Sequence, residues 1–273
     1  MIELSTERTL QFTLALAGTS SLVQALETLW IRPSWQDDRG IWRWNDLQPE
    51  FKNFPRILRS VLAILLSENG FTLLNVARAV ASLLLLWQPT DALVSSALWV
   101  ALTGSVLSAL RWRGAFNGGS DSMTLVVLLP LAISRLPWPD AALATRIALA
   151  YIALQSLLSY FIAGVVKVVE ANWRDGRALG EFLCNPQYGV PSAIQRLVRR
   201  PFAARFLAWS VLAFELLAPA LVLTPATCLT FLAVAALFHT VNARVLGLNR
   251  FVFAWISTYP AILFLAHWRA ETP

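Results

Sequence analysis

Long apolar runs separated by polar segments recur along the whole chain, and they constrain its fold more than any other feature. A helix that crosses a bilayer needs roughly 17–25 mostly apolar residues. By that measure we expect helices near residues 9–30, 71–88, 91–110, 121–138, 143–169, 206–224, 227–247 and 250–268. Six to eight of them are expected to span, because Gln24 and Glu27 weaken the first run while Pro130 and Arg135 interrupt the fourth. The sequence therefore predicts an all-α fold, a polytopic transmembrane helical bundle.

The composition agrees with a multi-pass integral membrane protein. Of the 273 residues, 57% are hydrophobic and only 14% are charged, whereas soluble domains carry about 25% charged residues. The net charge is +6, but the basic residues flank apolar runs, which argues against nucleic acid as a partner and for a lipid bilayer. We expect one integral-membrane domain over residues 1–273, without a large C-terminal soluble domain, in the inner (plasma) membrane if the chain is bacterial.

Two long polar connections interrupt the apolar runs. Residues 31–70 are rich in Trp, and their segment PRILRSVLAILL predicts one amphipathic helix that lies in the membrane interface. Residues 170–205 are rich in Gly, Pro and Arg and too polar to span. With eight spans, both connections and the loop after residue 110 fall on one side, which the excess of basic residues predicts to be cytoplasmic. That side collects 14 of the 22 basic residues, namely Arg32, Arg39, Arg43, Lys52, Arg56, Arg59, Arg111, Arg113, Arg174, Arg177, Arg196, Arg199, Arg200 and Arg205.

A single lysine, Lys167, lies inside the apolar stretch YFIAGVVKVVEANW. Residues three and four apart share a helix face. One stripe is therefore expected to hold Ser156, Tyr160, Ala163, Lys167 and Glu170, and Ala163 and Gly164 leave room for a close neighbour. Desolvation disfavours the ammonium form and would favour a neutral amine that takes a proton, whereas Glu170 would stabilise the charge. The alternative is that Lys167 only extends its ammonium group to the membrane surface.

Other polar residues in apolar runs are also candidates. His239 and Asn242 lie three apart on one predicted face, although a lone helix histidine is more often a structural hydrogen-bond partner. Glu215 lies in the middle of a predicted span, where it needs a partner such as Arg244 or Arg78, or a proton. An ion pair that holds helices together is as good an explanation for Glu215 as catalysis.

The segment NGGSD, from Asn117 to Asp121, is a glycine-rich turn that opens a helix. Its Ser or Asp is first of all a helix N-cap. The segment lacks the strand and the Lys of a phosphate-binding loop, so nucleotide binding is not supported. The two cysteines and two histidines show no metal-ligand spacing, and no metal is expected.

Two blocks resemble the vitamin K-dependent γ-carboxylase family and its bacterial relatives with the horizontally transferred transmembrane (HTTM) domain. YFIAGVVKVVEANWRDG is similar to their YF-I-AG-x-x-K segment followed by W-x-(E/D)-G, and it supplies Tyr160, Phe161, Ala163, Gly164, Lys167, Trp173, Asp175 and Gly176. FHTVNARVLGLNRF is similar to their F-H-x-x-N helix and supplies Phe238, His239 and Asn242. FELLAP, with Glu215, resembles a further stretch, and the resemblance covers roughly residues 8–268.

The resemblance implies that Lys167 is the base that deprotonates reduced vitamin K. It implies His239 as a second catalytic residue and a substrate-binding set of Tyr160, Gly164, Asn242, Trp173, Glu215, Asn117 and Asp121. The implied cofactors are a reduced quinone, O₂ and CO₂, and the family reaction adds CO₂ to the γ-carbon of a peptide glutamate. The polar loop at Asn117 carries no histidine, unlike that of the carboxylases, so a related quinol-linked reaction on another lipid-soluble substrate or peptide stays open.

Three functions follow from these residues. The first is a membrane enzyme, carboxylase-like (lyase) or quinol-oxidising, with Lys167 as general base. The second is a non-catalytic accessory protein for maturation or export of a peptide. The third is a transporter with Lys167, Glu215, Arg78 and His239 along a polar path, which ranks last because no inverted repeat of broken helices is visible.

Overall fold

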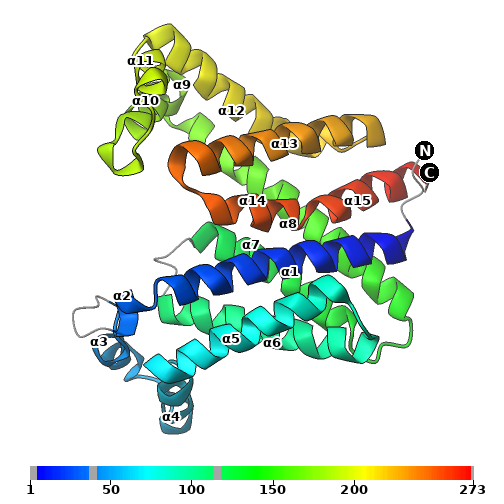
Figure 1. Cartoon of the computed structure of the whole chain (residues 1–273). Helices are drawn as coiled ribbons and strands as arrows, with labels where there is room; N and C mark the ends of the chain where they lie inside the picture. The colour runs from blue at the N-terminus through cyan, green and yellow to red at the C-terminus, as the bar shows by residue number, and fades with distance from the viewer. Residues whose placement is uncertain (1–4, 37–41, 113–117, 272–273) are drawn as a thin grey trace. The chain divides into compact units, whose positions relative to one another are not determined.

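The computed structural model describes residues 5–36, 42–112 and 118–271, and within these ranges it contains helices and no strand (Figure 1). The chain divides into two compact units. The N-terminal unit comprises residues 11–145, and the C-terminal unit comprises residues 146–273 together with residues 1–10. The helices are α1 Thr6–Trp30, α2 Pro33–Gln36, α3 Trp44–Leu47, η1 Gln48–Phe51, α4 Arg56–Leu65, α5 Glu68–Trp87, α6 Asp91–Trp112, α7 Gly118–Ser134, α8 Ala141–Val169, α9 Ala171–Arg174, α10 Arg177–Cys184, η2 Pro186–Tyr188, α11 Ser192–Val198, α12 Pro201–Leu221, α13 Pro225–Leu246, α14 Asn249–Ile256 and α15 Tyr259–Glu271.

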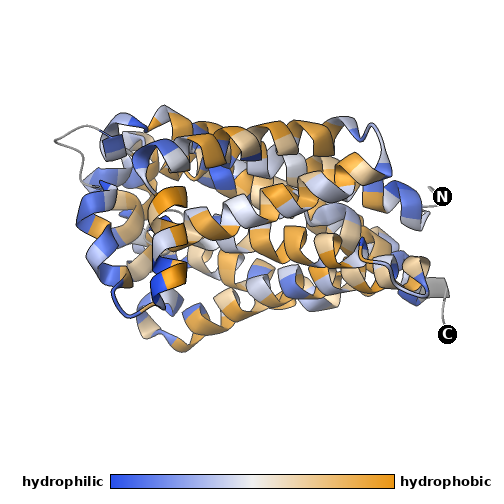
Figure 2. Cartoon of the chain, turned by 90° about the horizontal axis from the view of Figure 1, so that it is seen from below, coloured by the Kyte–Doolittle hydropathy of each residue, from blue (hydrophilic) through white to orange (hydrophobic). Residues whose placement is uncertain are grey.

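Each of the eight predicted apolar helices is present, with boundaries shifted by a few residues. Six segments of the described chain are long and apolar enough to cross a membrane: α5, α6, α8, α12, α13 and the α14–α15 pair. The fold is therefore a polytopic helical bundle, as predicted. Figure 2 shows that the long helices are mainly hydrophobic along their length, while hydrophilic residues gather near helix ends.

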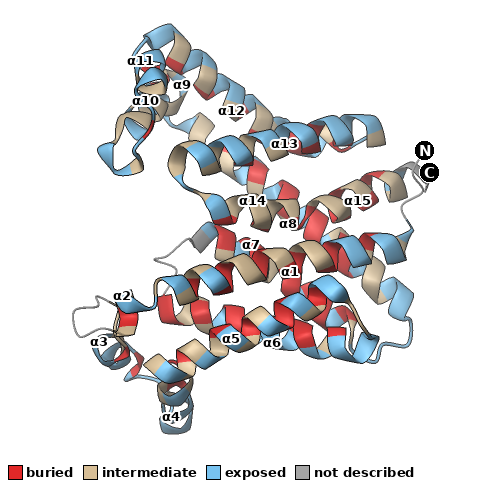
Figure 3. Cartoon of the chain, viewed as in Figure 1, coloured by how far each residue is buried: buried red, intermediate tan, exposed pale blue. Residues whose placement is uncertain are grey.

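Helix α1 is not among these six segments, and several of its polar residues face inward. In the N-terminal unit, Gln24 Nε2 donates to Thr124 Oγ1 at 2.6 Å, and the hydroxyl groups of Ser20 and Thr124 lie 3.0 Å apart. Arg78 Nε donates to Ser21 Oγ at 3.1 Å, and a second guanidinium nitrogen donates to Gln24 Oε1. These side chains are buried, and Figure 3 shows buried residues in red along α1. A buried polar network of this kind links α1 to α5 and α7.

The Trp-rich connection folds into a small aromatic core. Its buried members are Trp35, Trp44, Phe51, Leu62, Leu66, Phe71 and Trp112. Arg111 enters this core, with its guanidinium carbon 4.7 Å from the centre of the Phe71 ring and 5.4 Å from that of Trp35. It donates to the carbonyl oxygens of Leu66 and Trp42. Arg111 is thus fully buried, although the sequence groups it with the basic residues that flank the apolar runs.

Helix α4 is the amphipathic helix predicted for the same connection. Ile57, Val61 and Ile64 are exposed and lie at helical spacing on one side, while Arg56 and Arg59 lie on another. An apolar stripe beside basic residues is typical of a helix that lies in the membrane interface.

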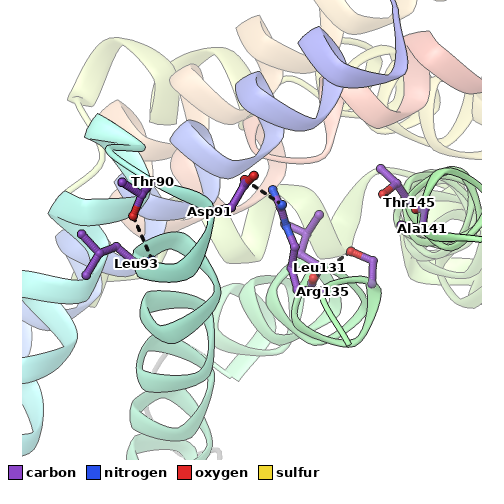
Figure 4. A network of polar contacts seen from close by, with 8 residues as sticks. Thr90, Asp91, Leu93, Leu131, Arg135, Ala141 and Thr145 are labelled. Carbon is purple, nitrogen blue, oxygen red and sulfur yellow. Dashed lines mark hydrogen bonds and ion pairs between the residues drawn. The ribbon is translucent and has the colours of Figure 1, made fainter. Parts of the chain in front are cut away.

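Helix α7 keeps Pro130 in its interior and ends at Ser134, one residue before Arg135. Arg135 therefore does not interrupt the helix, as the sequence had suggested, but lies just beyond it. Its guanidinium group pairs with the Asp91 carboxylate at the start of α6, at 3.2 Å (Figure 4). The pair joins these two helix ends within the N-terminal unit.

Candidate functional site

One face of α8 carries three polar side chains, and each of them meets a different helical segment of the C-terminal unit. The stripe predicted from the sequence thus faces the interior of this unit. The three pairs are Ser156 with Thr258 between α14 and α15 at 2.9 Å, Tyr160 with His239 on α13 at 2.7 Å, and Lys167 with Glu215 on α12 at 2.6 Å.

The Lys167–Glu215 ion pair is bidentate. Lys167 Nζ donates to Glu215 Oε1 at 2.6 Å and to Oε2 at 2.7 Å. The Glu215 side chain is only 5% exposed and that of Lys167 is 22% exposed. Lys167 Nζ also lies 5.5 Å from the centre of the Trp173 ring, within the range of a cation–π contact. The ammonium group is therefore held between a carboxylate and an aromatic face.

Two expectations about the counter-ions are wrong. Glu170 does not face Lys167, because α8 ends at Val169 and the backbone at Glu170 turns to an extended conformation that leaves its side chain exposed. Glu215 is not paired with Arg78, which makes its hydrogen bonds inside the N-terminal unit, or with Arg244, which is exposed on α13.

Gly164 brings α12 close enough for the pair to form. A Cβ atom at this position would lie 2.9 Å from Leu216 Cγ and 3.0 Å from both Glu215 Cβ and the Leu216 backbone nitrogen. A Cβ atom here would force the Leu216 side chain to shift and would press against the α12 backbone, so glycine lets the two helices approach without strain. The two helix backbones meet one turn before Lys167, and Glu215 lies beside its ammonium group.

The Trp173–Gly176 segment fixes the end of α8 to the start of α12. Arg174 Nη1 donates to the terminal carbonyl oxygens of α8, and the Trp209 indole donates to the Arg174 carbonyl at 3.0 Å. Asp175 lies two residues before α10, and the hydrogen bond that its carboxylate accepts from the Arg177 backbone N–H is the main cause of its lowered pKa. This segment places the Trp173 ring over Lys167.

The Tyr160–His239 pair lies two helical turns before Lys167 on α8, among aromatic rings. Tyr160 packs edge-on against Phe214 and Phe231, with ring centres 5.5 Å apart in both cases. The His239 ring lies 5.2 Å from that of Trp255. His239 is 4% exposed, and its Nδ1 atom has no hydrogen-bond partner in the structure.

The unpaired nitrogen gives His239 a free hydrogen-bonding atom in an apolar setting. If the Tyr160 hydroxyl donates to Nε2, Nδ1 carries a proton and is a donor; in the other tautomer Nδ1 is an acceptor. In both cases a buried polar atom without a partner is costly and favours a bound water or ligand.

The remaining sequence candidates are placed as follows. Asn242 is half-buried on α13, one turn beyond His239. Asp121 lies in the first turn of α7, in the N-terminal unit, and Asn117 lies outside the described residues. The sequence reasoning missed Phe214, Phe231 and Trp255, whose only signal was their aromatic character at helical spacing.

Comparison with known proteins places the site in a family. No three His, Cys, Asp or Glu side chains of the described residues gather to form a metal site. No curated protein and no solved structure matches the chain. Residues 140–268, which include Lys167, Glu215 and His239, match the family described as the HTTM domain. Residues 140–268 are therefore similar to the HTTM domain, and this match is consistent with the resemblance to the carboxylase-like membrane proteins.

Proposed function

We propose that this protein is a membrane enzyme in which Lys167 takes a proton from a weakly acidic hydroxyl of a lipid-soluble substrate, of the kind that a reduced quinone carries. The observation that carries the proposal is the placement of Lys167. Its amine lies on an apolar spanning helix, is held by the Glu215 carboxylate and is still partly exposed. A lysine in apolar surroundings can work as a general base because burial disfavours its charged form.

The residues around Tyr160 and His239, two helical turns before Lys167 on α8, suit the ring of a reduced quinone. Phe214, Phe231 and Trp255 offer flat apolar faces, and the unpaired His239 Nδ1 offers a hydrogen bond to a ring oxygen. These residues would hold the ring, and Lys167 would face its hydroxyl group. When bound, the quinol would supply the electrons that, with O₂, drive abstraction of a less acidic proton from a second substrate.

Side chains of this protein would accept the proton, stabilise the resulting charge and exclude water. Lys167 Nζ accepts the hydroxyl proton, and the ammonium group that forms stabilises the negative charge left beside it. Trp173 covers the amine from one side and limits access of water. Addition of CO₂ to a peptide glutamate is the family reaction and the first one to test, and a related quinol-linked reaction is the next.

Lys167→Arg is the sharpest variant for this test. Arginine keeps a cation and can pair with Glu215 through two N–H groups, but it does not lose its proton. In nanodiscs, with a reduced naphthoquinone, O₂ and labelled bicarbonate, we expect turnover to fall by about 100-fold or more. The apparent Tm should stay near that of the wild type. Wild-type turnover in this variant would refute Lys167 as the base.

A variant that removes the Lys167 side chain needs a second, compensating substitution at Glu215. Lys167→Ala leaves Glu215 buried without its counter-ion, which is destabilising by about 3–5 kcal/mol. The double variant Lys167→Ala/Glu215→Gln removes that cost, so a loss of activity in it reports on the lysine and not on unfolding.

A non-catalytic accessory role is the second candidate. The observation that favours it is that the same ion pair joins α8 to α12 and would lock them without any chemistry. In that case the purified protein does not consume quinol, and Lys167→Arg, which keeps the lock, retains binding to a partner peptide recovered by crosslinking.

A further inference from the structure

The Lys167–Glu215 pair raises a problem for a lysine base, because an ammonium group beside a carboxylate cannot accept a proton. Both carboxylate oxygens lie within hydrogen-bond distance of Nζ, at 2.6 and 2.7 Å. The lysine must therefore lose one proton before it can act. Among the residues that the structure describes, Glu215 is the one group in hydrogen-bond contact with Nζ that can receive this proton.

We infer that Glu215 takes the Lys167 proton, so that the pair reaches its basic form as a neutral amine beside a carboxylic acid. This inference rests on the function proposed above and gives Glu215 a role as proton acceptor for the base. Transfer of the proton breaks one N–H bond, forms one O–H bond and leaves the net charge of the pair unchanged. The amine can then take a hydroxyl proton from the substrate, whose O–H electron pair stays on the oxygen.

The surroundings favour this exchange. The attraction of a buried ion pair often fails to offset the lost hydration of its two charges, whereas an amine and a carboxylic acid have little hydration to lose. Glu215 is almost fully buried, and the Gly164 contact holds its backbone against α8. The proton thus moves over one short hydrogen bond without release to water.

Few other ionisable groups act on the pair. Tyr160 lies on the same face of α8, two turns before Lys167, and its hydroxyl group is paired with His239. On the other side, the Arg174 guanidinium group binds the carbonyl oxygens of Val168 and Val169, and the Glu170 side chain is exposed. Glu170 therefore offers a matched control, since it is a carboxylate close in sequence that does not touch Nζ.

Infrared spectroscopy of the protein in nanodiscs tests the inference without turnover. A carboxylic acid in apolar surroundings has a C=O stretching band that a carboxylate lacks, and the band shifts in D₂O. We expect this band in the wild type and in Glu170→Gln, and its absence in Glu215→Gln. It should grow in Lys167→Met, where Glu215 has no cation beside it. Identical carbonyl spectra of the wild type and Glu215→Gln at every pH that the fold tolerates would overturn the inference.

Turnover separates this inference from the proposed function. Glu215→Gln should lower quinol-dependent turnover by about 100-fold at neutral pH, with partial recovery at higher pH, where the lysine loses its proton to water. A pH profile of Glu215→Gln that is parallel to the wild type would contradict the inference. If the infrared band is present but Lys167→Arg is fully active, the proposed function is wrong, while proton transfer from Lys167 to Glu215 is still supported. If the band is absent but Lys167→Arg is inactive, Lys167 is still supported as the base, while Glu215 is not its proton acceptor.

Discussion

Gly176, in the C-terminal unit, has both a left-handed backbone and close backbone neighbours. Its backbone has φ +84°, and a Cβ atom there would lie 2.5 Å from the Arg205 backbone nitrogen and 2.6 Å from the Ala204 carbonyl carbon. Two separate constraints therefore require glycine: the left-handed conformation and the contact with the first turns of α12. Both follow from the turn that places Trp173 over Lys167.

Gly176→Ala should lower the free energy of unfolding by about 3 kcal/mol or more, because it adds a backbone clash to an unfavourable φ. Gly189→Ala is the matched control, since Gly189 has φ +58° with nothing within 4 Å of its added Cβ, and it should cost only about 1 kcal/mol. Apparent Tm values in detergent measure both. Equal losses in the two variants would show that the contact with α12 is not tight.

The identity of the ion-paired residues shows the limit of sequence reasoning at this scale. The helical stripe through Tyr160 and Lys167 followed from local spacing alone. Glu215, the partner of Lys167, lies 48 positions further along the chain. Glu170 follows Lys167 by only three positions, and no local feature of the sequence shows that Glu215, and not Glu170, forms the ion pair. The choice is made by where α8 ends and by the Gly164 contact, which are properties of the packed chain.

At the scale of helices, small residues decide which elements come into contact. Gly164 admits α12 against α8 in the C-terminal unit. In the N-terminal unit, a Cβ atom on Gly18 would lie 2.8 Å from the Ser82 carbonyl oxygen, so α1 and α5 also meet backbone to backbone. Such contacts are typical of membrane helices, where close packing replaces the hydrophobic effect between apolar helices.

Gly164→Ala should separate α8 from α12 and destabilise the protein by about 1–3 kcal/mol. The contact atoms include the Leu216 backbone nitrogen, which cannot move without its helix. Gly180→Ala on α10 is the control, because its Cβ would make only an ordinary contact with the Val198 carbonyl oxygen at 3.5 Å, and alanine favours a helix. We expect a lowered apparent Tm for the first variant and an unchanged or raised one for the second. A fully stable Gly164→Ala would contradict the close packing.

The helices themselves could be predicted from periodicity and hydropathy, but the residues that contact their polar side chains could not. Helix α1 looked weak because Gln24 interrupts its apolar run, and the structure turns Gln24 inward to Arg78 and Thr124. Arg111 looked like a surface anchor and instead fills an aromatic core. In both cases the partners come from distant parts of the N-terminal unit, which hydropathy does not report.

On the scale of the whole molecule, the HTTM match at residues 140–268 and the C-terminal unit from residue 146 cover nearly the same part of the chain. Hydropathy alone gives no sign of this division, because apolar helices continue without a break on both sides of it. The division matters for function, since Lys167, Glu215 and His239 all belong to the C-terminal unit.

The charge distribution of this unit predicts its orientation in the membrane. The connection from α9 to α11 and its flanks carry Arg174, Arg177, Arg196, Arg199 and Arg200, whereas the turn between α12 and α13 has no charged residue. Positive charge in short connections is retained on the cytoplasmic side. We therefore expect the α9–α11 connection to be cytoplasmic and the α12–α13 turn to face the other side.

Single cysteines test this orientation in a background with Cys184→Ser and Cys228→Ala. Ser192 on α11 and Leu223 in the α12–α13 turn are both exposed and lie at opposite ends of α12. A membrane-impermeant maleimide should label Leu223→Cys on intact cells, and Ser192→Cys only after permeabilisation. The reverse pattern would place the arginine-rich connection outside. Because Lys167 lies two residues from the end of α8 that leads into this connection, that pattern would also move the Lys167 amine, the proposed base, from the cytoplasmic to the opposite surface of the membrane.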